Sequence, residues 1–124
     1  MARQSAALAS SLPLAAVRVR PVDLVHLALQ TQGNKDLETE VLGLFVRQST
    51  QQVARIAAAG SDRERFEAAH LLKGSARAIG ANSVADCAEA LETAAQSTGD
   101  FAATLDDLRH AVAVANRFID DLID

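Results

Sequence analysis

The chain has 124 residues, which is enough for one domain and leaves little room for a second. Apolar residues make up 49% of it, sufficient for one continuous core, whereas aromatic residues make up only 3%. Helix-favouring Ala and Leu are abundant and strand-favouring residues are scarce, so the composition predicts an all-α fold. The net charge of −4 argues against nucleic acid as a partner, because domains that bind it usually present a basic face.

The sequence has no apolar stretch long enough to span a membrane, so we expect a cytoplasmic protein that does not bind a membrane. Residues 1–20 are interrupted by polar residues and by Pro13, and they are interpreted as a frayed or loosely docked helix, not as a signal peptide. The single cysteine, Cys87, has no partner for an internal disulfide and reads as a small core residue. Residues 21–124 are then the folded domain.

Five helical segments are expected after Pro21, separated by short connections that contain residues typical of helix ends. The third opens with the capping-box pattern Ser61-Asp62-Arg63-Glu64, and it stops at Gly80, a residue suited to ending a helix. The expected bounds are about 22–30, 35–59, 61–79, 82–96 and from 100 onward.

The last segment has the clearest hydrophobic pattern. From Phe101 to Leu122 its apolar residues recur at alternating steps of four and three, the stripe that a helical bundle buries. A similar stripe in the second segment includes Leu37, Leu44 and Phe45. Because short connections force neighbouring helices to run in opposite directions, we predict an antiparallel up-down four-helix bundle with an additional N-terminal helix.

The third segment carries the residues that suggest chemistry. At about 100° per residue, its small and apolar residues, Leu72 and Ser75 among them, fall on the side that faces the core. The opposite side collects Arg63, Phe66, Glu67, His70, Lys73, Gly74 and Arg77.

Gly74 is the least expected member of this outer face. A glycine inside a helix costs about 1 kcal/mol relative to alanine, and Gly80 already accounts for the end of the helix. The glycine therefore indicates that something bulky approaches the backbone beside His70. A neutral imidazole is a competent nucleophile, and Lys73, one turn later, is placed to neutralise charge on a phosphoryl group, with Arg77 as a further cation.

The pattern His70-x-Leu72-Lys73-Gly74-Ser75, followed by Gly80, resembles the histidine phosphotransfer (HPt) domain of bacterial two-component phosphorelays. The resemblance covers roughly residues 21–123. It includes the entry to the second helix at Gly33-Asn34-Lys35-Asp36-Leu37, and the run Cys87-Ala88-Glu89-Ala90-Leu91-Glu92 downstream.

The resemblance implies a role for each motif residue. His70 would accept a phosphoryl group from a receiver-domain aspartate on its outward Nε2 and pass it to another receiver. Lys73 would stabilise that group, and Gly74 would admit the receiver's loops. Ser75 would act through packing or by supporting its neighbours. Phe66, Leu71 and Arg77 are the candidates for partner contact.

The same resemblance implies the partners. They are response-regulator receiver domains and a hybrid sensor histidine kinase, with Mg²⁺ held by the receiver. We expect a monomeric phosphocarrier with no cofactor, no metal and no kinase activity of its own, because the sequence has neither a nucleotide-binding loop nor a carboxylate cluster for magnesium.

Two alternatives remain open. A non-catalytic interaction module would bind receivers without phosphotransfer, although His70, Lys73 and Gly74 together disfavour a degenerate site. A histidine kinase fragment is the second alternative. That family typically has an acidic residue directly after its histidine, whereas Leu71 follows His70 here, so this alternative is disfavoured. The other two histidines, His26 and His110, have no lysine and glycine in register, and they are interpreted as inert.

Overall fold

The computed structural model describes residues 20–95 and 100–124. The segment predicted to be a frayed helix lies outside the described residues except for Arg20. The described residues form five helices and no strand, which confirms the all-α class. None of these helices is long and apolar enough to span a membrane. The helices are α3 (Leu24–Thr31), α4 (Lys35–Ala58), α5 (Asp62–Ile79), α6 (Asn82–Ala95) and α7 (Phe101–Ile123).

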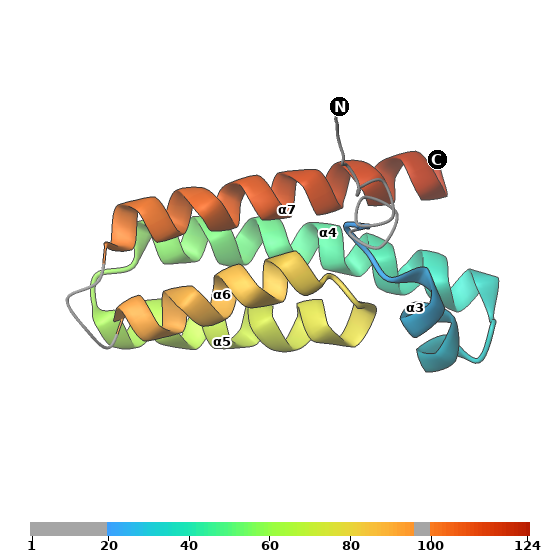
Figure 1. The fold of residues 1–124 in the computed structure, drawn as a ribbon, viewed down its shortest axis with the longest axis horizontal. Coiled ribbons are helices and arrows are strands. Elements are labelled where there is room, and N and C mark those ends of the chain that lie inside the picture. Colours follow the sequence, from blue (N-terminus) through green and yellow to red (C-terminus); the bar gives the residue numbers. More distant parts are fainter. Residues whose placement is uncertain (1–19, 96–99) are drawn as a thin grey trace, which may run out of the picture.

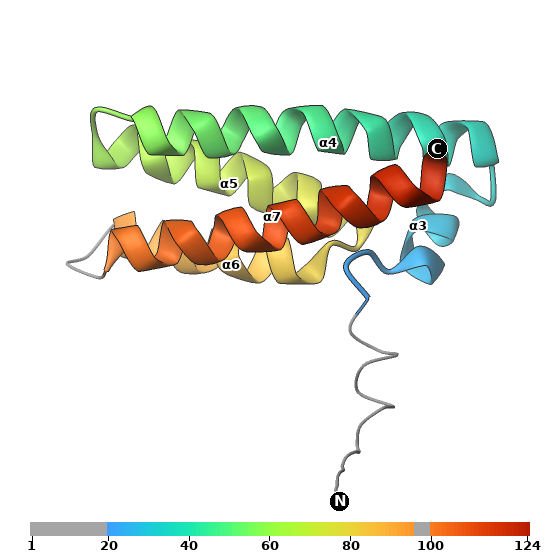
Figure 2. The same cartoon turned by 90° about the horizontal axis from the view of Figure 1, so that it is seen from above.

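The four long helices lie side by side, and the chain reverses direction at each connection between them (Figures 1 and 2). Helix α5 packs against α4 and α6, and α7 closes the arrangement by packing against the same two helices. The short α3 lies at one end, where it contacts α4 and α5. Helix α5 is therefore covered by α4 on one side and by α6 on the other, and its outer face remains exposed to solvent.

Local capping explains why α5 begins where the sequence predicts. The Ser61 side chain accepts a hydrogen bond from the Glu64 backbone N–H at 3.2 Å. The Glu64 carboxylate in turn accepts from the Gly60 N–H at 2.8 Å, one residue earlier than in the standard capping box. Asp62 and Glu64 also place negative charge in the first turn, which the helix dipole favours.

Gly80, at the end of α5, packs against Asp23, the residue that caps the start of α3. Its φ of +79° is a left-handed conformation that favours glycine, and its carbonyl accepts a 2.9 Å hydrogen bond from the Asp23 N–H. A Cβ at this position would lie 2.9 Å from the Asp23 Cβ, so the glycine is needed sterically as well. The close approach fixes α3 against the C-terminal end of α5.

The predicted stripe of α7 is buried over most of its length but not at its end. Leu105 to Ile119 supply its buried residues, whereas Leu122 is 46% exposed and Ile123 packs against the core instead. An α-helix drifts by about 20° per heptad from a seven-residue repeat, and the stripe runs for three heptads. The drift rotates Leu122 away from the core.

The stripe expected on α4 is partly wrong. Leu37 and Leu44 are exposed, and the buried positions include Leu42 and Ser49. Ser49 is buried because its hydroxyl pairs with the Asn116 side chain of α7, which donates to it at 3.1 Å. A buried polar residue satisfied from another helix is invisible to a hydrophobic pattern, so the sequence places the inner face of α4 slightly wrongly.

Candidate functional site

His70 projects outward from the middle of α5. Its neighbours Ala69 and Leu72 are buried against the other helices, so the helix cannot rotate without losing core contacts. The His70 side chain is 64% exposed. The structure thus places the imidazole where the sequence predicts, accessible to another molecule on a rigid element.

Glu92 of α6 holds this imidazole from the side. Its Oε2 lies 2.6 Å from His70 Nδ1, and its Oε1 accepts a 2.6 Å hydrogen bond from the Lys73 ammonium. The carboxylate is 9% exposed, so one buried anion joins two cationic or potentially cationic groups on the neighbouring helix. The three side chains form a bridge between α5 and α6.

The bridge determines which imidazole nitrogen is free. Burial raises the pKa of Glu92, but hydrogen bonds from Lys73 and His70 outweigh burial and hold that pKa below its ordinary value. The ionised carboxylate can only accept, so Nδ1 of His70 carries the proton. In the neutral imidazole, Nε2 is then the atom with the free lone pair. This assignment follows from the hydrogen-bond partner of Nδ1.

Glu92 is the residue that sequence reasoning missed as a site member. It belongs to the downstream run ending Leu91-Glu92, but no role was assigned to it. One signal was available: Glu92 lies four residues after Ala88, and therefore on the apolar face of its own helix. A carboxylate on a buried face needs a partner, and Lys73 and His70 are those partners.

The lowered pKa of Glu92 predicts a pH dependence of folding stability. Because the folded-state pKa of Glu92 lies below the ordinary value of 4.5, the stabilisation is present above that value and is lost as the pH falls through the folded-state pKa. Urea unfolding of the wild type and of Glu92→Gln should therefore show a stability difference at pH 6 that shrinks toward pH 3. A constant difference over that range would contradict the ionised bridge.

Lys73 is less exposed than expected for the outer face. Its side chain is only 14% exposed, and its ammonium is engaged by Glu92. The stem of a lysine readily covers apolar surface while its charged end finds a partner, which explains the position. The Lys73 ammonium therefore lies one helical turn from His70, but it is already paired with the Glu92 carboxylate.

The residues expected to contact a partner surround His70 in different ways. The Phe66 ring is half-buried and stacks on the imidazole, with ring centroids 5.7 Å apart and planes within 13°. Leu71 is 55% exposed and Arg77 is similarly exposed, in a 3.5 Å ion pair with Glu89. Phe66 therefore orients the imidazole from one side as Glu92 does from another.

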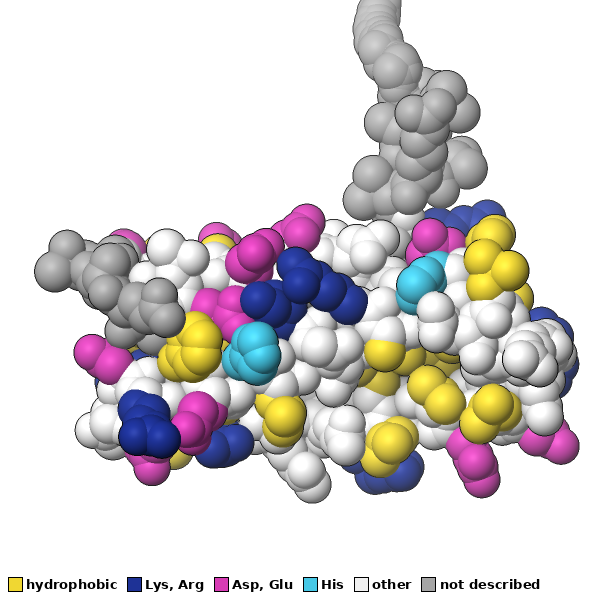
Figure 3. Space-filling model, turned by 90° about the horizontal axis from the view of Figure 1, so that it is seen from below, with side chains coloured by type: hydrophobic (Ala, Val, Ile, Leu, Met, Phe, Trp, Pro, Cys, Tyr) yellow, Lys and Arg dark blue, Asp and Glu magenta, His cyan; other side chains and the backbone are white. Residues whose placement is uncertain are grey.

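Gly74 and Ser75 lie on the helical turn that follows His70. No atom stands within 4 Å of a Cβ added at Gly74, apart from the helix's own nearby backbone, so the glycine faces open space. Ser75 is half-buried, not fully in the core, and lines a shallow hollow between α4 and α5 together with Leu44 and Ala78. Figure 3, which views the molecule from the α5 side, shows hydrophobic side chains on the same face as histidine and basic side chains.

The remaining candidates lie apart from this site. His26 is half-buried on α3, and His110 is exposed on α7. Cys87 is a free thiol that is half-buried and packs against the edge of the core, so the expected core position is correct only in part. In the described part of the chain no cluster of His, Cys, Asp or Glu has the make-up of a metal site.

Comparisons with known proteins place the chain. The Hpt domain family matches residues 40–123. The crystal structure of histidine-containing phosphotransfer protein B (HptB) from Pseudomonas aeruginosa PAO1 is similar, with a TM-score of 0.78 and 21% identity. The structural similarity covers 85% of this chain and 96% of that chain, and it shows that the two proteins share a fold. No curated protein sequence matches.

Proposed function

Since the chain belongs to the Hpt domain family, we propose that it is a histidine-containing phosphotransfer protein whose His70 accepts a phosphoryl group from a receiver-domain aspartate and passes it to another receiver. The observation that supports this best is the exposed imidazole with Nδ1 held by Glu92 at 2.6 Å. In the neutral imidazole, that contact leaves the free lone pair on Nε2, and the exposed ring makes this atom accessible to a partner. An antiparallel bundle of α4 to α7 is the rigid support.

The proposed transfer needs no activation by this chain. Nε2 of His70 attacks the phosphorus of the receiver's aspartyl phosphate, so an N–P bond forms as the P–O bond to the aspartate breaks. The receiver recovers its carboxylate, and the imidazole becomes a cationic phosphohistidine that keeps its Nδ1 proton. The Glu92 carboxylate stabilises that positive charge, in the way that a buried carboxylate supports a catalytic histidine in other enzymes.

Lys73 has two parts in this proposal. Its ammonium neutralises Glu92 before transfer. Because Lys73 lies one helical turn from His70, its charge also helps to offset the negative charge of the incoming phosphoryl oxygens. Phosphoryl transfer depends mainly on positioning and on such charge stabilisation. We propose that Mg²⁺ belongs to the receiver, so the chain acts as a phosphocarrier with no kinase activity of its own.

The partner surface follows from the exposed side chains around His70. We propose that Leu71 and the stacked Phe66 contact the receiver, and that Arg77 adds charge at the edge. Exposed apolar residues beside a few polar groups are typical of such interfaces. The hybrid kinase partner, the cytoplasmic location and the monomeric state stay predictions.

One assay separates this function from the non-catalytic alternative. Purified receiver domains encoded by the same genome are charged with radiolabelled acetyl phosphate and mixed with the chain. We expect label to move to the chain from at least one receiver within minutes. A receiver that binds the chain without passing label, with no other receiver passing any, would favour the interaction module.

Gly74 yields a prediction in which folding and function change in opposite directions. Gly74→Ala should raise the free energy of unfolding by about 1 kcal/mol, because alanine favours the helix and its Cβ meets no atom within the fold. Gly74→Gln should keep the helix content but slow label transfer about tenfold or more, because a long side chain obstructs the receiver. Chemical denaturation and transfer kinetics measure the two effects. A normal transfer rate in Gly74→Gln would refute the close approach.

A further inference from the structure

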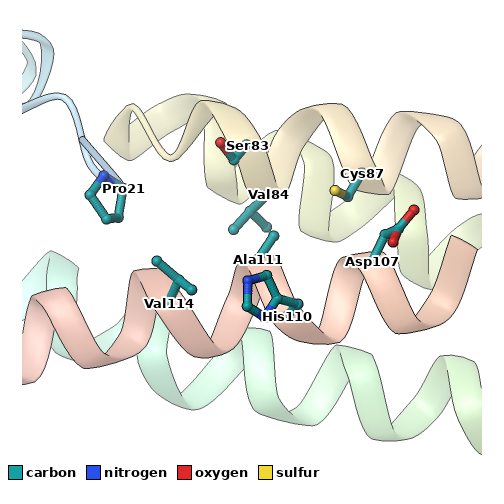
Figure 4. A pocket seen from close by; sticks show the side chains of 8 residues that line it. All are labelled: Pro21, Ser83, Val84, Cys87, Asp107, His110, Ala111 and Val114. Carbon is teal, nitrogen blue, oxygen red and sulfur yellow. The ribbon is translucent and has the colours of Figure 1, made fainter. Parts of the chain in front are cut away.

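A second hollow lies away from the phosphotransfer site, between α6 and α7. It has a volume of about 440 Å³ and is lined mainly by apolar side chains. Figure 4 shows Pro21 and Val114 at one end of this groove and Cys87 and Asp107 at the other. The distance from 107 to 114 along α7 is about 10 Å at 1.5 Å per residue.

The chain itself enters the groove. Pro21 lines one end, so the residues immediately before it are tethered at that point. From Val17 to Pro21 the sequence alternates apolar and basic residues, Val-Arg-Val-Arg-Pro. In an extended segment alternate residues share a face, so an extended conformation would put Val17, Val19 and Pro21 on one side and the two arginines on the other. Arg20 is indeed exposed where Pro21 turns toward the groove.

The length and the charge of the segment before Pro21 also match those of the groove. Four extended residues span about 13 Å, close to the length of the groove. Residues 1–20 carry three arginines and no acidic residue, so the whole acidic excess lies in the rest of the chain. Asp107 lines the groove, and Asp86 is close enough to act with it, after burial, in raising the pKa of the Cys87 thiol. Within residues 20–95 and 100–124 neither carboxylate forms an ion pair.

We propose that residues 17–20 of this chain occupy the groove between α6 and α7 as an extended strap. Val17 and Val19 cover the apolar lining near Val84 and Val114. Arg18 lies at the rim and pairs with Asp107 or Asp86. The tether at Pro21 makes this docking intramolecular, which raises the effective concentration of the strap at the groove.

The native cysteine provides the test, because Cys87 is the only cysteine and lies at the far end of the groove. Val17→Cys and Arg18→Cys are made in the full chain and oxidised mildly at low concentration. The strap points residue 17 into the groove and residue 18 out of it, so the disulfide to Cys87 should form about tenfold faster in Val17→Cys. Non-reducing gels and mass spectrometry follow the product.

Equal rates for these two adjacent positions would overturn the proposal, because an undocked segment presents both alike. A disulfide-linked dimer as the main product at low concentration would also overturn it, since a second copy would then fill the groove. Matching circular dichroism of the reduced variants verifies that the helices are intact.

A second measurement leaves Cys87 as the only thiol. Val17→Ser/Val19→Ser should raise the rate of Cys87 alkylation by N-ethylmaleimide several-fold, because the cover is weakened. The matched control is Val25→Ser/Leu29→Ser on α3, an equally apolar pair whose side chains are already exposed. An unchanged rate in the first double variant, or an equal rise in the control, would contradict the strap.

Discussion

His70→Gln should abolish phosphoryl acceptance, with a loss of at least about 1000-fold in the transfer rate. An amide nitrogen is not a nucleophile, whereas the imidazole Nε2 that it replaces carries a free lone pair. The side chain is 64% exposed, so the free energy of unfolding should change by no more than about 1 kcal/mol. Transfer of label from a charged receiver and urea unfolding measure the two quantities independently.

The other histidines serve as controls for this variant. His26→Gln and His110→Gln should accept label at the wild-type rate, because neither imidazole lies near a carboxylate and lysine pair like that of Glu92 and Lys73. If His70→Gln still accepted label while one of the other variants did not, the site would be assigned to the wrong histidine.

Glu92→Gln should have the second largest effect. The amide keeps the shape of the side chain but removes the negative charge that supports the phosphohistidine cation and offsets Lys73. We expect a fall in the transfer rate of about 10- to 100-fold, less than for a fully buried group because His70 is largely exposed. The free energy of unfolding should fall by about 1–3 kcal/mol, since the Lys73 charge remains at a mostly buried position.

A tautomer measurement distinguishes this positioning role from a merely structural one. In ¹⁵N NMR spectra of the wild type, neutral His70 should carry its proton on Nδ1, whereas Glu92→Gln should show a mixture of tautomers. Glu89→Gln is the matched control, because Glu89 is an exposed carboxylate of the same helix that pairs with Arg77. Equal losses in the two variants, or an unchanged tautomer in Glu92→Gln, would contradict the role of the bridge.

The parts of the fold that the sequence predicts well are those decided locally. The start of α5 follows from Ser61 and Glu64, which cap the backbone within one turn. Its end follows from Gly80, whose left-handed conformation few other residues adopt. The exposure of His70 follows from the spacing of buried residues along the same helix.

The parts that it predicts poorly depend on partners far along the chain. Glu92 lies 22 residues after His70, and only the packing of α6 on α5 brings the two together. The inner face of α4 is displaced because Ser49 pairs with Asn116 from α7. Hydrophobic periodicity is read from the apolar residues of a single helix. It therefore gives the wrong inner face where a buried polar residue is hydrogen-bonded by another helix.

The central claim is that the phosphoryl group resides on Nε2 of His70, and NMR of the phosphorylated chain tests it most directly. With uniformly ¹⁵N-labelled protein charged from a phosphorylated receiver, phosphorus–nitrogen couplings and imidazole shifts identify the phosphorylated atom. We predict a single phosphohistidine with phosphorus on Nε2 of His70 and the proton retained on Nδ1 toward Glu92. Phosphorus on Nδ1 of His70, on another histidine, or on a carboxylate of this chain would contradict it.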